Sequence, residues 1–187
     1  MNKGALTLAP QPKSDRYGRT LAQVFADGVW VQADLVRSGL MRASPGLADR
    51  GCGKLLLKAD SEARDAKARH WGDGVFSLRT PDELRNRPGS FQIVEGNGVS
   101  ASVNSGRAFI DFGADYRSDF TLTVSPADMR TFRQERFDVK SLSGKRIWVR
   151  GWIESYNGPE MEIATPLAIE VLNESRPDPT ASASRVR

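Results

Sequence analysis

The sequence DRYGRTLAQVFADG, residues 15–28, decides how the first part of this chain folds. Its Tyr-Gly pair is a turn signal, and residues 20–26 form a short apolar run suited to a strand. An Asp-Gly turn follows. Residues 31–40 then place apolar side chains at helical spacing, with Gly39 as a helix stop. The stretch therefore predicts a strand, a turn and a helix, preceded by another strand at residues 5–8.

This order of motifs resembles the thermonuclease (staphylococcal nuclease-like) family, whose D-x-Y-G-R-x-L-A signature is matched at residues 15–22. The L-V-R-x-G-L helix follows, and then a helical pattern at residues 55–70, rich in Ala and charged side chains and ending at a tryptophan, as in the family. The resemblance covers roughly residues 4–71. It implies that Arg19 contacts the phosphate being cleaved. The residues alone also allow Arg19 to be a turn arginine paired with Asp15 on the surface.

Two neighbours of Arg19 are further candidates for binding nucleic acid. Arg16 and Tyr17 flank the same turn, where an arginine can touch a phosphate and an aromatic ring can stack on a base. The alternative is that both side chains simply hold the loop together.

The resemblance also implies catalytic elements for which this sequence offers no residues. In the family, three strands and a loop with a second arginine, metal-binding aspartates and a catalytic glutamate precede the strand at residues 5–8. In that family, hydrolysis of a phosphodiester needs a metal to polarise the phosphate and a carboxylate to activate the attacking water. One arginine stabilises charge but supplies no nucleophile. We expect no cofactor in this chain and an incomplete catalytic site; Ca²⁺ or another divalent metal is implied only if that loop were present.

Length and composition bound the remaining possibilities. The 187 residues predict one or two domains, and a hydrophobic content of 39% suffices for packed cores. No apolar run is long enough to span a membrane, and no signal peptide is visible, so localisation stays open. The single cysteine, Cys52, excludes an internal disulfide, and its flanking glycines predict a loop. His70, the one histidine, has no partners for a metal site.

Charge is distributed unevenly along the chain. The net charge is +4, and residues 1–75 carry 12 basic and 8 acidic side chains. Residues 90–172 carry 9 basic and 11 acidic ones. The basic excess therefore lies mainly in the nuclease-like part, which suits an anionic partner there.

Glycine and proline residues mark the predicted boundaries between the domains of the chain. Residues 1–75 are predicted to form a partial nuclease-like domain, and residues 76–89 a connector. A short helix is expected inside the connector, because an N-cap threonine precedes a proline and two acids. Residues 90–172 are predicted to form a β domain, and residues 173–187 a disordered tail.

The β domain shows the alternation typical of half-buried strands. After these strand candidates comes a helix with Met129 and Phe132 facing inward, then further strands around an Asn-Gly hairpin turn. This is the order of a five-stranded OB barrel. The expected fold class is α+β, mainly β: a partial nuclease-type OB barrel with helices, then a second five-stranded OB-like barrel. Strands are expected at residues 91–95, 99–103, 107–112, 120–124 and 147–153.

The same segment resembles the OB-like nucleic-acid-binding domain found after thermonuclease domains in some bacterial proteins. The matching pieces are G-R at residues 106–107, I-D-F-G at 110–113, D-Y-R-S-D-F-T at 115–121, V-R-G-W-I at 149–153 and N-G-P at 157–159. The resemblance makes Arg107 a candidate nucleic-acid contact.

One strand of the β domain carries a possible stacking surface. Trp148, Arg150 and Trp152 occupy alternate positions and would form an aromatic and cationic row that holds a single strand. The alternative is that this row packs against the nuclease-like half or the tail. Asp111, Asp115 and Asp119 have a spacing that suits no metal site, so none is predicted.

Two classes of function remain open. One is a metal-dependent phosphodiesterase whose catalytic loop is missing from this chain. The other is a nuclease relative that holds single-stranded or double-stranded nucleic acid, or docks a protein, without cutting. A homo-oligomer or a partner chain is a further expectation, because the first barrel needs more strands. No membrane partner is expected.

Overall fold

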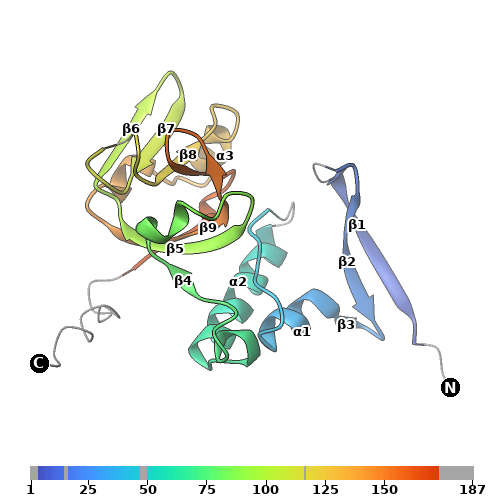
Figure 1. Cartoon of the computed structure of the whole chain (residues 1–187). Coiled ribbons are helices and arrows are strands. Elements are labelled where there is room, and N and C mark those ends of the chain that lie inside the picture. The colour runs from blue at the N-terminus through green and yellow to red at the C-terminus, as the bar shows by residue number, and fades with distance from the viewer. Residues whose placement is uncertain (1–3, 15–16, 47–49, 116, 173–187) are drawn as a thin grey trace, which may run out of the picture. The chain divides into compact units, whose positions relative to one another are not determined.

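The computed structural model describes residues 4–14, 17–46, 50–115 and 117–172 (Figure 1). The chain divides between Ser77 and Leu78 into two compact units. Mainly β structure with three α-helices makes up the described residues, as the α+β expectation predicts. The predicted tail at residues 173–187 lies outside the described residues. No helix in the described ranges is both long and apolar enough to cross a bilayer.

The first unit begins with a long hairpin. Strand β1 (Leu6–Ser14) pairs antiparallel with β2 (Thr20–Ala26), which turns at an Asp-Gly pair into the short β3 (Val29–Trp30). In the register of β1 and β2, Leu6 lies opposite Ala26. The prediction of a strand at residues 20–26 is confirmed, and β1 extends beyond its predicted end.

Two helices follow the hairpin. Helix α1 (Val31–Arg37) stops before Gly39, whose φ of 74° is left-handed and where a Cβ would lie 2.2 Å from the Ala68 carbonyl oxygen. Helix α2 spans Arg50–Asp65, so it begins and ends about a turn earlier than the sequence predicted. Its early end has a local cause, because Lys67 adopts a left-handed φ of 50°. The predicted loop around Cys52 is wrong, since this residue lies in the first turn of α2.

A buried carboxylate joins α2 to the segment after α1. Asp60 is fully buried, and its Oδ1 accepts the backbone N–H of Ala43 at 3.1 Å. Its Oδ2 lies 3.8 Å from Nη1 of Arg64, one helical turn later. The guanidinium of Arg64 in turn lies over the Trp71 ring, 5.9 Å from its centroid. The charged pair thus fixes the loop, the helix and the 3-10 helix η1 (Arg69–Trp71) to one another.

Most of the predicted connector belongs to the second unit. Strand β4 (Leu78–Arg79) pairs in parallel with β5 (Phe91–Asn97), and the expected short helix is the 3-10 helix η2 (Pro81–Leu84). Thr80 and Glu83 form a capping box at its start. The Thr80 N–H, and then the Arg79 guanidinium, lower the pKa of the Glu83 carboxyl below its ordinary value.

The second unit has the strand order of an OB barrel. The first barrel strand is bent: its half β5 pairs with β9 (Arg146–Trp152), and its half β6 (Ser100–Asn104) pairs with β7 (Arg107–Asp111). β7 pairs with β8 (Thr121–Val124), and β8 pairs in parallel with β11 (Pro159–Glu162). This parallel pairing follows helix α3 (Met129–Gln134) and the 3-10 helix η3 (Val139–Leu142). The short strands β10 (Glu154–Ser155) and β12 (Ile169–Val171) and the 3-10 helix η4 (Pro166–Ala168) complete the unit.

Alternation along these strands builds the core of the second unit. Ile110, Leu122 and Val149 are fully buried inside, and α3 adds Phe132, whose ring meets Phe137 edge-on at 5.7 Å. Both inward-facing residues predicted for α3 are buried, as the helical spacing indicated. The alternate residues of β7, β8 and β11 therefore point away from the core and form an outer face.

Candidate nucleic-acid interface

Residues 17–19 of the signature motif lie between β1 and β2, at the tip of the hairpin. Tyr17 is 68% exposed, and the Arg19 guanidinium lies over its ring, 5.1 Å from the centroid. Gly18 between them has a φ of 76°, the left-handed conformation that glycine adopts at low cost. The tight turn therefore folds Arg19 back onto Tyr17. Arg16 and Asp15 lie outside the described residues, so neither the Arg16 candidate nor the Asp15 pairing has a described position.

This pair presents a cation and an aromatic ring together at the surface. A guanidinium above a ring makes contact through its plane, whereas phosphate recognition uses its N–H edge. The two contacts are geometrically compatible in one arginine. The hairpin tip thus combines the two side-chain types used to hold a nucleic-acid backbone and its bases.

The aspartates singled out in the sequence stabilise a loop of the second unit. Asp115 accepts the backbone N–H of Arg117 at 3.2 Å and the Ser118 hydroxyl at 3.1 Å. Asp119 accepts the backbone N–H of Asp115 at 2.9 Å. Asp111 accepts the hydroxyl of Ser100 at 2.6 Å. Across the described ranges, no three His, Cys, Asp or Glu side chains are grouped closely enough to hold a metal ion.

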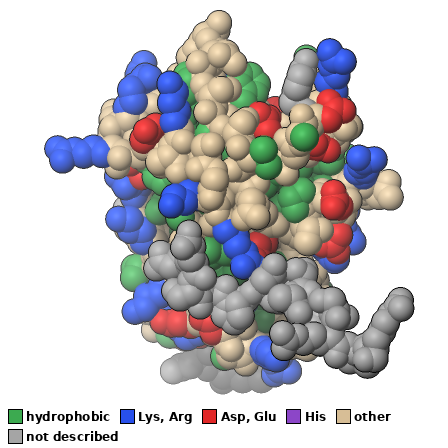
Figure 2. Space-filling view, turned by 90° about the vertical axis from the view of Figure 1, so that its left-hand side faces the viewer, with side chains coloured by type: hydrophobic (Ala, Val, Ile, Leu, Met, Phe, Trp, Pro, Cys, Tyr) green, Lys and Arg blue, Asp and Glu red, His purple; other side chains and the backbone are tan. Residues whose placement is uncertain are grey.

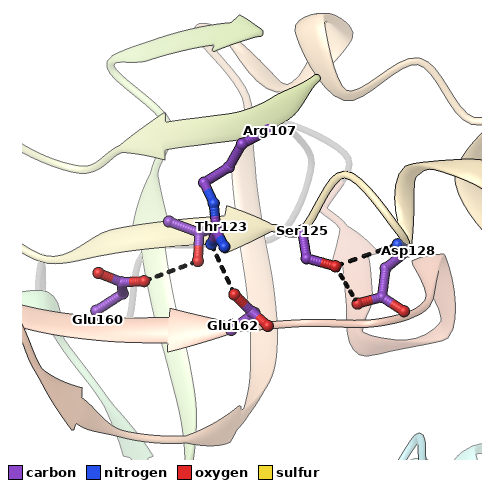
Figure 3. A network of polar contacts seen from close by, with 6 residues as sticks. All are labelled: Arg107, Thr123, Ser125, Asp128, Glu160 and Glu162. Atoms are coloured by element: carbon purple, nitrogen blue, oxygen red, sulfur yellow. Dashed lines mark hydrogen bonds and ion pairs between the residues drawn. The ribbon is translucent and has the colours of Figure 1, made fainter. Parts of the chain in front are cut away.

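Arg107 lies on the outer face of β7, β8 and β11, where its charge is already matched (Figure 3). Its Nη1 donates to Oε2 of Glu162 at 2.6 Å across the sheet. On the same face, the Thr123 hydroxyl donates to Oε1 of Glu160 at 2.9 Å. Figure 3 also shows Ser125 and Asp128, joined at 2.6 Å, at the start of the α3 segment. The sheet therefore holds Arg107 in an ion pair rather than displaying it alone.

The outer face of these strands is acidic. Glu160 lies directly opposite Glu154 of β10, and Glu162 follows two residues later on the same side of β11. Asp111 adds a fourth carboxylate at the end of β7. Like charges placed directly opposite each other destabilise a strand pair. A phosphate backbone would be repelled by this face.

The row Trp148, Arg150 and Trp152 does not form one exposed surface. Trp148 is 3% exposed and Arg150 is 4% exposed, whereas Trp152 is 48% exposed. The Trp148 indole N–H donates at 2.6 Å to Oε2 of Glu95, its cross-strand neighbour. Trp152 meets the Phe91 ring edge-on with centroids 6.0 Å apart. Of the three, Trp152 is the one that presents a ring at the surface.

A hollow in the second unit was missed by the sequence analysis. Its volume is about 270 Å³. It is bounded by Arg85 just after η2, by the loop that contains Arg117, and by the hairpin of β10 and β11. Arg85 and Arg117 line it together with Glu154. Gly158, at a φ of 106°, brings the hairpin against the loop, because a Cβ there would lie 2.8 Å from the Ser118 carbonyl oxygen. The R-S-D and N-G-P motifs were visible signals, but their contact depends on the tertiary fold.

Basic and acidic side chains are both exposed on the face of the molecule shown in Figure 2, and hydrophobic side chains lie among them. Neither sign of charge alone covers that face.

The hairpin and helices of the first unit match a known family. The model of the staphylococcal nuclease homologue family matches residues 2–73. A comparison with curated proteins found no match.

Several solved structures resemble part of the chain at low similarity. An aspartyl-tRNA synthetase of Leishmania major Friedlin, described as putative, is 11% identical with a TM-score of 0.37; the match covers 54% of this chain and 21% of the synthetase. Asparaginyl-tRNA synthetase from Pyrococcus horikoshii is 12% identical with a TM-score of 0.35; the match covers 50% of this chain and 22% of the synthetase. The OBody AM1L10 bound to hen egg-white lysozyme is 14% identical with a TM-score of 0.32, over 48% of this chain and 86% of the OBody. This chain thus spans about a fifth of the synthetases that it matches.

The family match and the hairpin geometry agree. Residues 17–22 of the motif form the turn and the first half of β2, and the two helices that follow lie within the matched range. Residues 2–73 of this chain therefore belong to the staphylococcal nuclease homologue family.

Proposed function

We propose that this chain binds nucleic acid through its sugar–phosphate backbone and that its own residues do not complete a site for cleavage. The observation that carries the proposal is the exposed pair of Tyr17 and Arg19 at the tip of the β1–β2 hairpin. The pair lies within the family match.

The chemistry of the pair supports a phosphate contact. The planar guanidinium of Arg19 offers parallel N–H donors that fit two oxygens of one phosphate. The Tyr17 ring offers a flat face on which a base can stack, and every base has such a face. Both contacts are tolerant of sequence, so we expect little preference among bases.

Binding without cleavage follows from what Arg19 can do. A guanidinium stabilises the charge that develops on a phosphate. Hydrolysis also needs an activated water and a general base that accepts the proton of this water. Tyr17 and Arg19 alone supply neither a metal to activate the water nor a carboxylate to take its proton.

Binding of a fluorescently labelled oligothymidylate to the full chain at low salt tests this proposal. We expect saturable binding that weakens about tenfold in Arg19→Ala, because hydrogen bonds to charged groups contribute about 1.5–3 kcal/mol. Arg37→Ala is the matched control: Arg37 is an exposed arginine on α1 of the same unit. Equal weakening in both variants, or no binding by the wild type, would contradict the proposal.

A further inference from the structure

Charge is segregated within the second unit. Residues 130–145 carry five basic side chains against two acidic ones. The rest of the β domain, residues 90–129 and 146–172, carries four basic against nine acidic side chains. The slightly acidic total of the domain therefore hides one basic segment, which we call the basic α3–η3 segment. Its cations are Arg130, Arg133, Arg136, Lys140 and Lys145.

The fold of this segment directs its apolar side chains inward and its cations outward. On α3, Met129 and Phe132 are buried in the barrel core, while Arg130 and Arg133, three residues apart, are exposed. Residues at this spacing share one side of a helix. On η3 the same division recurs, with Leu142 fully buried. The basic side chains of η3 and of the turn after it, Lys140 and Lys145, are exposed.

Two further contacts fix the shape of the segment. Arg136 adopts a φ of 54° directly after α3, so the chain reverses there and packs Phe137 onto Phe132. At the far end, the Gly98 N–H donates to the Lys145 carbonyl at 2.9 Å. A Cβ on Gly98 would lie 2.7 Å from the Leu142 carbonyl oxygen, so β5 and β6 close tightly against η3. The cations are thus carried on a fixed part of the barrel.

The five cations differ from other arginines of this unit in their pairing. Among the described residues, no hydrogen bond or ion pair engages the charged group of any of the five. By contrast, Arg79 pairs with Glu83, Arg107 with Glu162 and Arg146 with Glu95.

Two acidic residues near these cations, Asp138 and Asp128, hold the local backbone or a hydroxyl. The carboxylate of Asp138 accepts the Lys140 backbone N–H at 3.0 Å and caps η3. The carboxylate of Asp128 accepts the Ser125 hydroxyl at 2.6 Å. With Glu135 and Asp138 counted, the segment keeps a clear excess of five positive over two negative side chains.

We propose that the basic α3–η3 segment is the surface of the second unit that contacts the phosphates of a bound nucleic-acid strand. The inference rests on the proposed function and moves the contact away from the outer face of β7, β8 and β11. That face carries Asp111, Glu154, Glu160 and Glu162, which repel phosphate. The segment offers five cations against two carboxylates, Glu135 and Asp138.

Contacts of this kind set the salt dependence of binding. Each phosphate neutralised on a single strand releases counterions and contributes about 0.7 to the slope of log K against log salt. Phosphates are common to DNA and RNA, so strands of the same sequence should bind alike.

The test compares two double variants of the full chain that lose the same charge. Arg130→Gln with Arg133→Gln removes two cations of the segment; Arg85→Gln with Arg117→Gln removes two exposed arginines of the hollow. Binding of labelled oligothymidylate and oligouridylate is measured at several salt concentrations. We expect the first variant to reduce the salt slope by about 1.4, which is two phosphate contacts. The control should keep the wild-type slope.

The outcomes separate this inference from the proposed function. If the two double variants lose the same amount of slope, or the first loses none, the segment is not the contact and the inference is overturned. In that case Arg19→Ala still reports on the hairpin. If the wild type binds neither strand, both proposals fail. Circular dichroism checks that each variant keeps its fold, and Lys140→Gln with Lys145→Gln provides a second pair that leaves α3 intact.

Discussion

The two units of this chain bury their apolar side chains to very different degrees. In the second unit, residues of the barrel strands and of α3 form one continuous core, with Ile110 and Phe132 fully buried. In the first unit, Leu6 and Leu8 of β1 are 71% and 63% exposed. Its buried cluster consists of small and medium side chains near the helices: Ala33, Val36, Ala43, Leu56 and Ala59.

This difference separates stability from recognition. The second unit has the packing that makes a fold cooperative. The first unit has the family motif, on a hairpin whose apolar residues are largely exposed. We infer that the second unit is the more stable of the two, while the hairpin tip of the first unit serves recognition together with the basic α3–η3 segment. Four experiments test this difference between the units.

The largest effect is expected from removing a core ring. Phe132→Ala should lower the free energy of unfolding of the second unit by about 3–5 kcal/mol, because it leaves a cavity among buried side chains. Leu8→Ala should change stability by less than about 0.5 kcal/mol, since this side chain is mostly exposed. Urea unfolding curves measure both. A comparable loss in Leu8→Ala would show that the hairpin face is covered in solution.

The next effect concerns the buried carboxylate of the first unit. Asp60→Ala should destabilise this unit by about 3 kcal/mol, because it leaves the Arg64 charge buried without its partner. The amide of Ala43 loses its acceptor as well. Amide hydrogen exchange should accelerate in α2 and leave β5 and β9 unchanged. Faster exchange in both units would mean that they unfold together, which would contradict the expectation that the first unit is destabilised alone.

A smaller effect is expected at the hairpin of the second unit. Gly158→Ala should cost about 1–3 kcal/mol, because a left-handed φ and a close carbonyl oxygen coincide there. Gly144→Ala is the control, since Gly144 has a φ of 74° but no atom within 4 Å of the added Cβ. The difference in thermal midpoint between the two variants isolates the steric part. Equal midpoints would show that the loop containing Ser118 moves away from the added Cβ at no cost in stability.

The smallest effect concerns the Glu83 capping box. Its folded-state pKa lies below the ordinary value of 4.5, mainly because of the Thr80 N–H and then Arg79. The stabilisation is therefore present above pH 4.5 and is lost as the pH falls through the folded-state pKa. Glu83→Gln should cost less than about 1 kcal/mol at neutral pH, given the partial exposure of the pair. In acid, wild type and variant should converge; a constant difference across pH would contradict this account.

The sequence predicted much of the fold because its local signals were strong. Alternating residues placed the barrel strands, and the spacing of Met129 and Phe132 gave the inner side of α3 correctly. The limits of α2 were predicted wrongly, because the left-handed turn at Lys67 has no distinctive residue type. Burial of Trp148 and the pairing of Arg107 with Glu162 depend on cross-strand register, which single-sequence patterns do not contain.

The candidate binding residues also include some that the sequence predicted and some that it did not. The motif around Arg19 was recognisable because it is contiguous, and its turn is one that the Tyr-Gly signal predicts. The basic α3–η3 segment was hidden, because its charges were averaged with the acids of the whole β domain. Only the fold shows which acids are used as caps.

Whether this chain holds nucleic acid without cutting it can be measured in a single sample. A labelled single-stranded DNA is incubated with the full chain and added Ca²⁺ at low salt, and the same sample is analysed for both retention and strand length. The account predicts that the strand is retained and intact, with weaker retention in Arg19→Ala. An unretained strand, or cleavage that disappears in Arg19→Ala, would contradict it.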